Sequence, residues 1–493
     1  MILAAFLFCK SKNHVAIPVI LPYNGQLLQR SIKTREGVKF VDKVSSKRFW
    51  RKLLPLVFPI AFEQLMYSFV SASDALMLGL LDQASLSAVS LAAQVQFVFS
   101  LFMSGLSSGG SILAAQCWGR GQKEQVERVY AILLRAAALV GGVFFAAAFC
   151  VPGLIMRFFT PDPELIELGS QYLRVVSLSY LSSSINQSNM CIMKNTGRAS
   201  RASLISSCCV MINLGLNAVL IFGLFGLPAL GVRGAALATL LAQLICLSWG
   251  IYETSRFKAV RLRRRFLTDL TMPLQKNFWK YTIPVMANSV VWGLGITMGS
   301  VVLGHLGTDA VAANSIASIA KNLIACFCNG LAAGTAILVG NELGAGQLER
   351  AKQYGNRLVI LAVVSGVISG AILIALTPVI RSVAVLSDQA MEYLRWMIVV
   401  CAFNIAGMSH NSTTICGLFA AGGDTKFGFF CDAITLWVVV VPLGFFTAFV
   451  LEWPVIAVYA VICMDEIVKL PVVWRHCKKY RWVKDLTQSL HVE

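Results

Sequence analysis

The chain has 493 residues, of which 57% are hydrophobic and only 13% are charged. With a mean hydropathy of +0.71, this composition excludes an ordinary soluble globular protein, in which about a quarter of the residues are charged. The net charge of +18 could suit a nucleic-acid-binding protein, but the positions of the basic residues argue against one.

Twelve long apolar stretches follow one another between Leu53 and Trp474. A helix needs about 20 mostly apolar residues to cross a bilayer, and a helix satisfies its own backbone polar groups in lipid. The stretches are continuous, whereas a β-barrel would show alternating segments of about ten residues. We therefore predict an all-α polytopic membrane protein with twelve transmembrane helices. The predicted spans are 53–79, 86–116, 128–156, 165–195, 200–223, 230–254, 279–304, 310–340, 351–382, 388–418, 428–450 and 454–475.

Lysine and arginine are concentrated in alternate connections between these spans. The longest basic connection runs from Arg256 to Lys280. Basic connections are cytoplasmic by the positive-inside rule, so both termini are predicted to be cytoplasmic. We expect a multi-pass protein of the plasma (inner) membrane, with the lipid bilayer as a partner and no nucleic acid. The opposite connections hold little more than Arg157, Arg233, Arg381 and Arg395.

The first 48 residues begin with the apolar segment "MILAAFLFC". This segment is too short for a span and lacks the basic region of a signal peptide. We predict residues 1–48 to be a flexible cytoplasmic extension. The fourteen cysteines show neither metal-ligand spacing nor a disulfide framework, and we predict them to be small apolar core residues.

The sequence contains an internal duplication. Residues 102–124 and 327–349 share ten identities in twenty-three positions at an offset of 225, and the same offset relates Pro59 to Pro284. Each copy holds six spans, an even number, so both copies begin on the same side of the membrane. This is a parallel repeat, a form of architecture found in transporters that work by alternating access. The predicted parts are an amino-terminal lobe (49–255), a cytoplasmic linker (256–278), a carboxyl-terminal lobe (279–476) and a basic cytoplasmic tail (477–493).

Several segments together resemble the multidrug and toxic compound extrusion family, called MATE, over residues 49 to 487. They are "FPIAFEQLMYSFVSASDALMLGLL", "NLGLNAVLIFGLFG", "GVRGAALATLLAQ", "IPVMANSVVWGLG", "LVGNELGAGQLERAKQYGNRL" and "LFAAGGDTKFGFFCD". The resemblance implies twelve helices in two six-helix lobes. It also implies export of organic, often cationic or aromatic, compounds in exchange for H⁺ or Na⁺.

In that family an acidic residue of the first helix is central to ion coupling, and the resemblance aligns it with Asp74. Some members have an acid four residues after an asparagine of the fifth helix, where this chain has Asn213 and Asn217. Many relatives have a glutamate in the seventh helix, where this chain has Asn288 and Ser289. Both departures argue against a sodium site with several carboxylates.

Two acidic residues lie inside the first predicted span. Glu63 and Asp74 are eleven residues apart, which is about three helical turns, so they share one face about 16 Å apart. An aspartate at the centre of a span costs roughly 2.5 to 3.5 kcal/mol, which indicates a function. At the offset of 225 the acids become Asn288 and Gly299. We therefore predict that ion coupling resides in the amino-terminal lobe.

The hypothesis is antiport at Asp74. Burial favours the neutral carboxyl, whereas a nearby cation favours the carboxylate, so a bound proton and a bound organic cation exclude one another. We expect no cofactor beyond the coupling ion and no metal ion other than Na⁺ at Asp74, should sodium be that ion. The alternative is a structural aspartate that neighbouring hydroxyls satisfy.

Polar stretches inside two spans predict a wet substrate cavity. "LSSSINQSNM" contributes Asn186, Gln187 and Asn189, and "NIAGMSHNSTT" contributes His410 and Asn411. Each of these side chains could instead form a helix-to-helix hydrogen bond, and Glu466 and Lys469 could pair on one helix face. The predicted ion-coupling residues are Asp74, Glu63, Asn213, Asn217 and Thr239. The predicted cavity residues are Asn186, Gln187, Asn189, His410, Asn411 and Asp432.

Two other functions stay open. A flippase for lipid-linked precursors would need cations to grip diphosphate, yet the spans hold few beyond Arg135 and Arg174. A membrane-embedded enzyme is less favoured, because the sequence has no HExxH, GxSxG or phosphate-loop motif. We predict a monomeric transporter of small organic substrates and not an enzyme.

Overall fold

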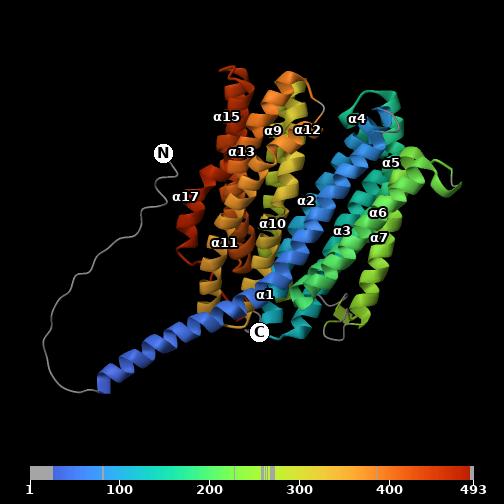
Figure 1. The fold of residues 1–493 in the computed structure, drawn as a ribbon. Coiled ribbons are helices and arrows are strands. Elements are labelled where there is room, and N and C mark those ends of the chain that lie inside the picture. The colour runs from blue at the N-terminus through green and yellow to red at the C-terminus, as the bar shows by residue number, and fades with distance from the viewer. Residues whose placement is uncertain are drawn as a thin grey trace. The chain divides into compact units, whose positions relative to one another are not determined.

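The computed structural model describes residues 26–79, 83–226, 228–256, 260, 263, 265–266, 272–384 and 386–488. Every regular element among these residues is helical (Figure 1). The chain divides into two compact units, 1–51 and 52–493, and the description below concerns the second. Asp74 and its neighbour Ala75 lie in a helix, but their side chains are outside the described part of the chain.

The helices of the second unit form an amino-terminal and a carboxyl-terminal lobe. The first lobe contains α1 (Gln26–Gly79, here from Lys52), α2 (Gln83–Gly119), α3 (Lys123–Cys150), α4 (Pro152–Phe159), α5 (Pro163–Met193), α6 (Ala199–Phe222) and α7 (Gly231–Arg256). The second contains α9 (Met272–His305), α10 (Thr308–Gly344), α11 (Leu348–Ala375), α12 (Thr377–Val383), α13 (Asp388–Ser412), α14 (Thr425–Ile434), α15 (Val441–Phe449), α16 (Val455–Ile462) and α17 (Asp465–Cys477). Short π- or 3₁₀-helical turns connect or interrupt these helices at Lys194–Arg198, Leu224–Gly226, Thr413–Phe419 and Thr435–Val440.

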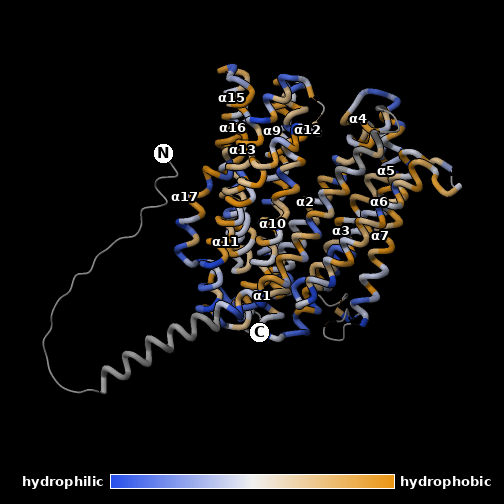
Figure 2. Tube along the Cα trace, in the orientation of Figure 1, coloured by the Kyte–Doolittle hydropathy of each residue, from blue (hydrophilic) through white to orange (hydrophobic). Residues whose placement is uncertain are grey.

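The twelve predicted spans are confirmed among the described residues. Ten stretches are long and apolar enough to cross a membrane, and one of them, Pro163–Phe222, holds both α5 and α6. The twelfth span is the broken helix pair α16 and α17. Figure 2 shows hydrophobic residues along the lengths of the helices and more hydrophilic residues toward their ends.

The first helix is longer than predicted. It begins at Gln26 rather than near Leu53, because residues 26–52 contain no proline and a single glycine, so little in them stops a helix that the apolar span continues. Residues 1–25 of the predicted flexible extension, and residues 257–259, 261–262, 264 and 267–271 of the predicted linker 256–278, lie outside the described residues.

The internal repeat is also a repeat of the backbone. The starts and ends of α2 and α10 differ by 225 residues, as do those of α3 and α11, and the starts of α5 and α13. The turns after α2 and α10 are alike, since Gly121 and Gly346 both adopt positive φ, +82° and +73°. Glycine is favoured there because other residues are strained in this region. The parallel repeat of two six-helix lobes is therefore confirmed.

The two lobes meet where α2 and α10 end, which we call the basic end, defined by the turns at 120–122 and 345–347 and by residues 421–424. Gly119 packs against the backbone of Asn341, and Gly344 packs against the backbone of Gln116. The Gln116 side chain is fully buried and donates to the carbonyl of Ala421 at 2.6 Å. Backbones this close require residues without a side chain at the contact.

The carboxyl-terminal segment, residues 478–488, also joins the lobes at the basic end. Trp482 is fully buried and packs on Gly355 and Gly422 of the second lobe. Four residues later, the backbone N–H of Leu486 donates to Oε1 of Gln116 in the first lobe at 2.7 Å. The predicted basic tail thus contributes to the contact between the lobes.

We expect that Gly344→Ala destabilises the protein by about 1 to 3 kcal/mol, because the new β-carbon would overlap the carbonyl of Gln116 and push α2 from α10. Thermal unfolding in detergent measures the effect. Gly304→Ala is the matched control, since a β-carbon there meets open space and should be neutral or slightly stabilising. Equal effects of the two substitutions would contradict the close contact.

Candidate functional site

The candidate ion-coupling helix is α1, which carries Glu63 and Asp74. The side chain of Asp74 lies outside the described residues, so its predicted role stays a prediction. Glu63 is described and is buried, with 4% of its surface exposed. The two positions lie about three turns apart on the same helix.

Glu63 forms an ion pair that crosses from α1 to the break between α5 and α6. Its carboxylate lies 2.8 Å from the Nζ of Lys194, and the hydroxyl of Ser203 donates to it at 2.7 Å. The break between α5 and α6, at Gly197 with φ of +82°, lies three residues after Lys194. A carboxylate with a cation and a hydroxyl in contact is well satisfied, so Glu63 ties α1 to α5 and α6.

The predicted coupling residues Asn213, Asn217 and Thr239 are brought together between α6 and α7. Asn213 donates to the hydroxyl of Thr239 at 3.4 Å, and Asn217 donates to Oδ1 of Asn213 at 3.4 Å. Thr239 in turn donates to the carbonyl of Ala235 at 3.1 Å. These long, neutral hydrogen bonds form a polar ladder that contains no carboxylate among its described members.

Two of the three predicted cavity residues of α5 are buried against α7, and the third is half-buried. Asn186 and Asn189 are buried and face α7, where Asn186 donates to Sγ of Cys246 at 3.1 Å and Asn189 accepts from Thr254 at 2.6 Å. Both amides pack against Gly250. Gln187 is half-buried. The geometry of Asn186 and Asn189 agrees with the alternative of helix-to-helix hydrogen bonds.

The carboxyl-terminal lobe contains a cluster of buried charges centred on Lys469, which is 2% exposed. Its Nζ lies 2.8 Å from Asp432, 3.2 Å from Glu466 and 3.5 Å from Asp465. Asp432 also accepts from Asn288 at 2.9 Å. The prediction that Glu466 and Lys469 pair is confirmed, and Asp432, predicted to line the substrate cavity, joins them as a third partner in the protein interior.

His410 and Asn411 lie beside this cluster on α13. Asn411 donates to Oε2 of Glu466 at 2.8 Å and to its backbone carbonyl at 2.7 Å. The Nδ1 of His410 lies 3.1 Å from Oδ1 of Asn411. Both side chains are buried, so they support Glu466 in this conformation.

Sequence reasoning missed three charged residues of these two clusters. Lys194, Asp465 and Lys321, the last of which lies near the middle of α10, are not among the predicted site residues. The signal was present in each case, because an ionisable residue within a span is costly and requires a partner or a function.

Two repeated six-helix lobes, each with ionisable groups buried inside it, define a polytopic membrane transporter. The MatE family model matches the chain twice, over residues 59–219 and over residues 284–446. The matches begin 225 residues apart, which is the offset of the internal repeat, and together they cover more than half of the chain. The protein belongs to the MatE family of multidrug efflux transporters.

Curated relatives match over most of the chain. The uncharacterized transporter YisQ of Bacillus subtilis (strain 168) is 23% identical over 448 residues, which are 90% of this chain and 97% of that protein. A probable multidrug resistance protein NorM of Rhizobium meliloti (strain 1021) is 27% identical over 424 residues, 80% of this chain and 88% of that protein.

Solved structures share the fold. The outward-facing conformation of a multidrug resistance MATE family transporter of the MOP superfamily gives a TM-score of 0.80 at 18% identity, covering 87% of this chain and 95% of that one. A MOP superfamily transporter from Pyrococcus furiosus Vc1 (DSM3638) gives 0.81 at 18% identity, covering 88% and 96%.

We expect that Glu63→Gln lowers the free energy of unfolding by about 3 kcal/mol, because it leaves the Lys194 ammonium without its carboxylate. The double variant Glu63→Gln with Lys194→Met removes both charges and should recover more than half of that loss. Thermal or denaturant unfolding in detergent, analysed as a double-mutant cycle, measures the coupling. Strictly additive effects would mean that the two charges do not stabilise one another.

Proposed function

We propose that the protein is a secondary active exporter that moves small organic compounds, often cationic or aromatic, out of the cell in exchange for H⁺ or Na⁺. The observation that carries this proposal is the match of the MatE family to each of the two lobes. Relatives named as probable multidrug resistance proteins support it. The proposed protein is a transporter, not an enzyme, and uses no cofactor beyond its coupling ion.

The proposed orientation has the basic end and both termini in the cytoplasm, in the plasma (inner) membrane. It rests on the excess of lysine and arginine in the connections at that end. Contacts between the lobes at the basic end, such as Gln116 with Ala421, would then close the cytoplasmic side. The lipid bilayer and a small organic substrate are the proposed partners, and we propose a monomer that binds no nucleic acid.

Energetics constrain the exchange. Trading one external monovalent cation for one internal organic monocation moves no net charge, so only the chemical gradient of the coupling ion drives it. Export of a neutral compound would also use the membrane potential, about 2.3 kcal/mol per 100 mV. Each 1.4 kcal/mol corresponds to about tenfold accumulation, so the charge of the substrate sets how far it can be expelled.

Efflux of ethidium from proteoliposomes, under an imposed pH gradient and separately under an imposed sodium gradient, tests the proposal. Stimulation by one gradient alone identifies the coupling ion. Ethidium or a panel of neutral and cationic dyes that responds to neither gradient would argue against antiport and favour the flippase reading.

We expect Asp74→Asn to abolish gradient-driven efflux, because an amide cannot exchange a proton for a cation, while the protein still inserts and folds. Efflux and a melting curve in detergent are measured on the same preparation. Glu349→Gln, which removes an exposed acid at the start of α11, is the control and should keep full activity. Unchanged efflux in Asp74→Asn would remove this residue from the mechanism.

A further inference from the structure

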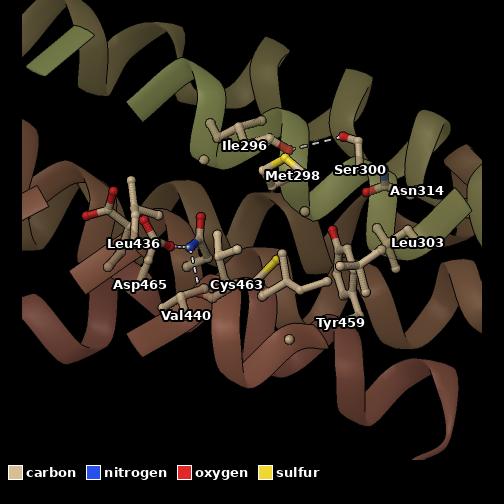
Figure 3. Close-up of a pocket in the computed structure, with 18 of the residues that line it drawn as sticks. Ile296, Met298, Ser300, Leu303, Asn314, Leu436, Val440, Tyr459, Cys463 and Asp465 are labelled. Atoms are coloured by element: carbon tan, nitrogen blue, oxygen red, sulfur yellow. Dashed lines mark hydrogen bonds between the residues drawn. The ribbon is translucent and has the colours of Figure 1, made fainter. Parts of the chain in front are cut away.

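A cavity lies inside the carboxyl-terminal lobe, between α9, α10, α13, α16, α17 and the Thr435–Val440 turn (Figure 3). Its volume is about 140 Å³, which gives room for a few water molecules but is much less than the roughly 300 to 1,000 Å³ of a drug-sized site. Its polar and charged lining residues include Lys321, Asn404, Tyr459, Asp465 and Glu466.

The internal repeat relates this cavity to the position of Asp74. At the offset of 225, Asp74 corresponds to Gly299, which lines the cavity. The predicted coupling residue Thr239 corresponds to Met464, the neighbour of Asp465. The second lobe thus has a glycine where the first has an acid, and a carboxylate from α17 lines the cavity beside it.

The charges around the cavity do not balance. The carboxylates of Asp432, Asp465 and Glu466 face the ammonium groups of Lys321 and Lys469. Three negative groups and two positive groups leave a net charge of one negative when all are ionised. An uncompensated charge within the spans is costly, so binding of one more positive charge would stabilise this cluster.

The three carboxylates differ in how well they are satisfied. Asp432 has contacts of 2.8 Å with Lys469 and 2.9 Å with Asn288, and Glu466 has a 2.8 Å bond from Asn411 besides Lys469. The side-chain contacts of Asp465 are longer, 3.5 Å to Lys469 and 3.4 Å from Asn404, and the backbone of Glu466 also forms a hydrogen bond with it. Asp465 therefore has the most capacity to take a further positive charge, and it lines the cavity (Figure 3).

Lys321 lines the same cavity from α10. It forms no ion pair with any residue in the described ranges, yet its ammonium interacts electrostatically with Asp465 and Glu466. A cation fixed in the wall lowers the cost of a carboxylate there. It also repels a free metal cation, whereas a proton that binds Asp465 covalently removes the negative charge.

We propose that the carboxyl-terminal lobe holds a second proton-exchange site, in which Asp465 takes up and releases one proton and Lys321 is the resident counter-cation that keeps Na⁺ out. The site rests on the proposed antiport for its use in transport, but its proton exchange does not. In the step, a proton from water binds a carboxylate oxygen of Asp465 to give the neutral acid, and release reverses it.

Other titratable groups surround the site, and they come from α10, α13, α14, α16 and α17. The facing groups are Glu466 and Lys469 of α17, Lys321 of α10, Asp432 of α14, Tyr459 of α16, the adjoining Cys463, and Cys401 and His410 of α13.

Infrared difference spectra of the full-length protein in liposomes, recorded between acidic and alkaline pH without substrate, test the exchange. One carboxylic acid C=O band of a buried aspartic acid, separate from any band of Asp74, should be present in the wild type and lost in Asp465→Asn. Glu349→Gln is the matched control, because that acid is exposed, and it should retain the buried-acid band. A spectrum of Asp465→Asn identical to the wild type would overturn the proposal.

Lys321 variants test the role of the counter-cation. Replacing choline chloride by sodium chloride at equal ionic strength and fixed pH should leave the band unchanged in the wild type and in Lys321→Arg. In Lys321→Met the ammonium of Lys321 no longer repels sodium from Asp465, so sodium should displace the proton and weaken the band. A band insensitive to sodium in Lys321→Met, or sensitive in the wild type, would overturn the assigned role, even if Asp465→Asn failed to fold.

The two proposals fail separately. Loss of the infrared band in Asp465→Asn without any gradient-driven efflux in the wild type would refute antiport and leave the proton site standing. Antiport that persists with no Asp465 band would refute the proton site alone.

Discussion

The fold depends on one constraint, which is that a charge inside a membrane-spanning helix must have compensation nearby. Lys469 meets it by contacting three carboxylates, and Glu63 meets it through Lys194 and Ser203. These contacts join α1 to α6 and α14 to α17. The pairing of buried charges therefore also helps to fix how the helices pack within each lobe.

The parts of this fold that the sequence predicts are those that the bilayer dictates locally. Span lengths, the offset of 225 and the two lobes follow from apolar runs and a repeated pattern, and the Glu466–Lys469 pair follows from a spacing of three residues on one helix. The start of α1 was missed because a polar helix before a span has no apolar signal. The roles assigned to Asp74 and to the asparagines of the cavity stay predictions.

The rest could not be predicted because the partners are far apart in the chain. Glu63 and Lys194 are 131 residues apart, so no local spacing in the sequence predicts that they meet. Asp432 was predicted to line a substrate cavity, but its carboxylate contacts Lys469, which lies on another helix 37 residues later in the chain. The prediction that ion coupling resides in the amino-terminal lobe came from comparing the acids of the first span with the residues 225 positions later. That comparison could not find the buried carboxylates of the second lobe, because they lie on α14 and α17.

The distribution of charge also bears on how the lobes could move. The deeply buried ion pairs described here lie within a lobe. The polar contacts described between the lobes are hydrogen bonds of the Gln116 side chain to backbone groups and ion pairs with one partly exposed partner, and they accompany close packing of α2 on α9 and α10. In Arg120–Asp485 the arginine is 35% exposed, and in Lys52–Glu342 the lysine is 40% exposed. Partly exposed pairs contribute about 1 kcal/mol or less, and breaking a buried pair costs several. A rocking of whole lobes, which the proposed exchange requires, would therefore separate the partly exposed ion pairs and rearrange the helix packing between the lobes, while it preserves the buried ion pairs within each lobe. Opening at the basic end would leave the Glu63 and Lys469 clusters, and any proton held beside them, intact.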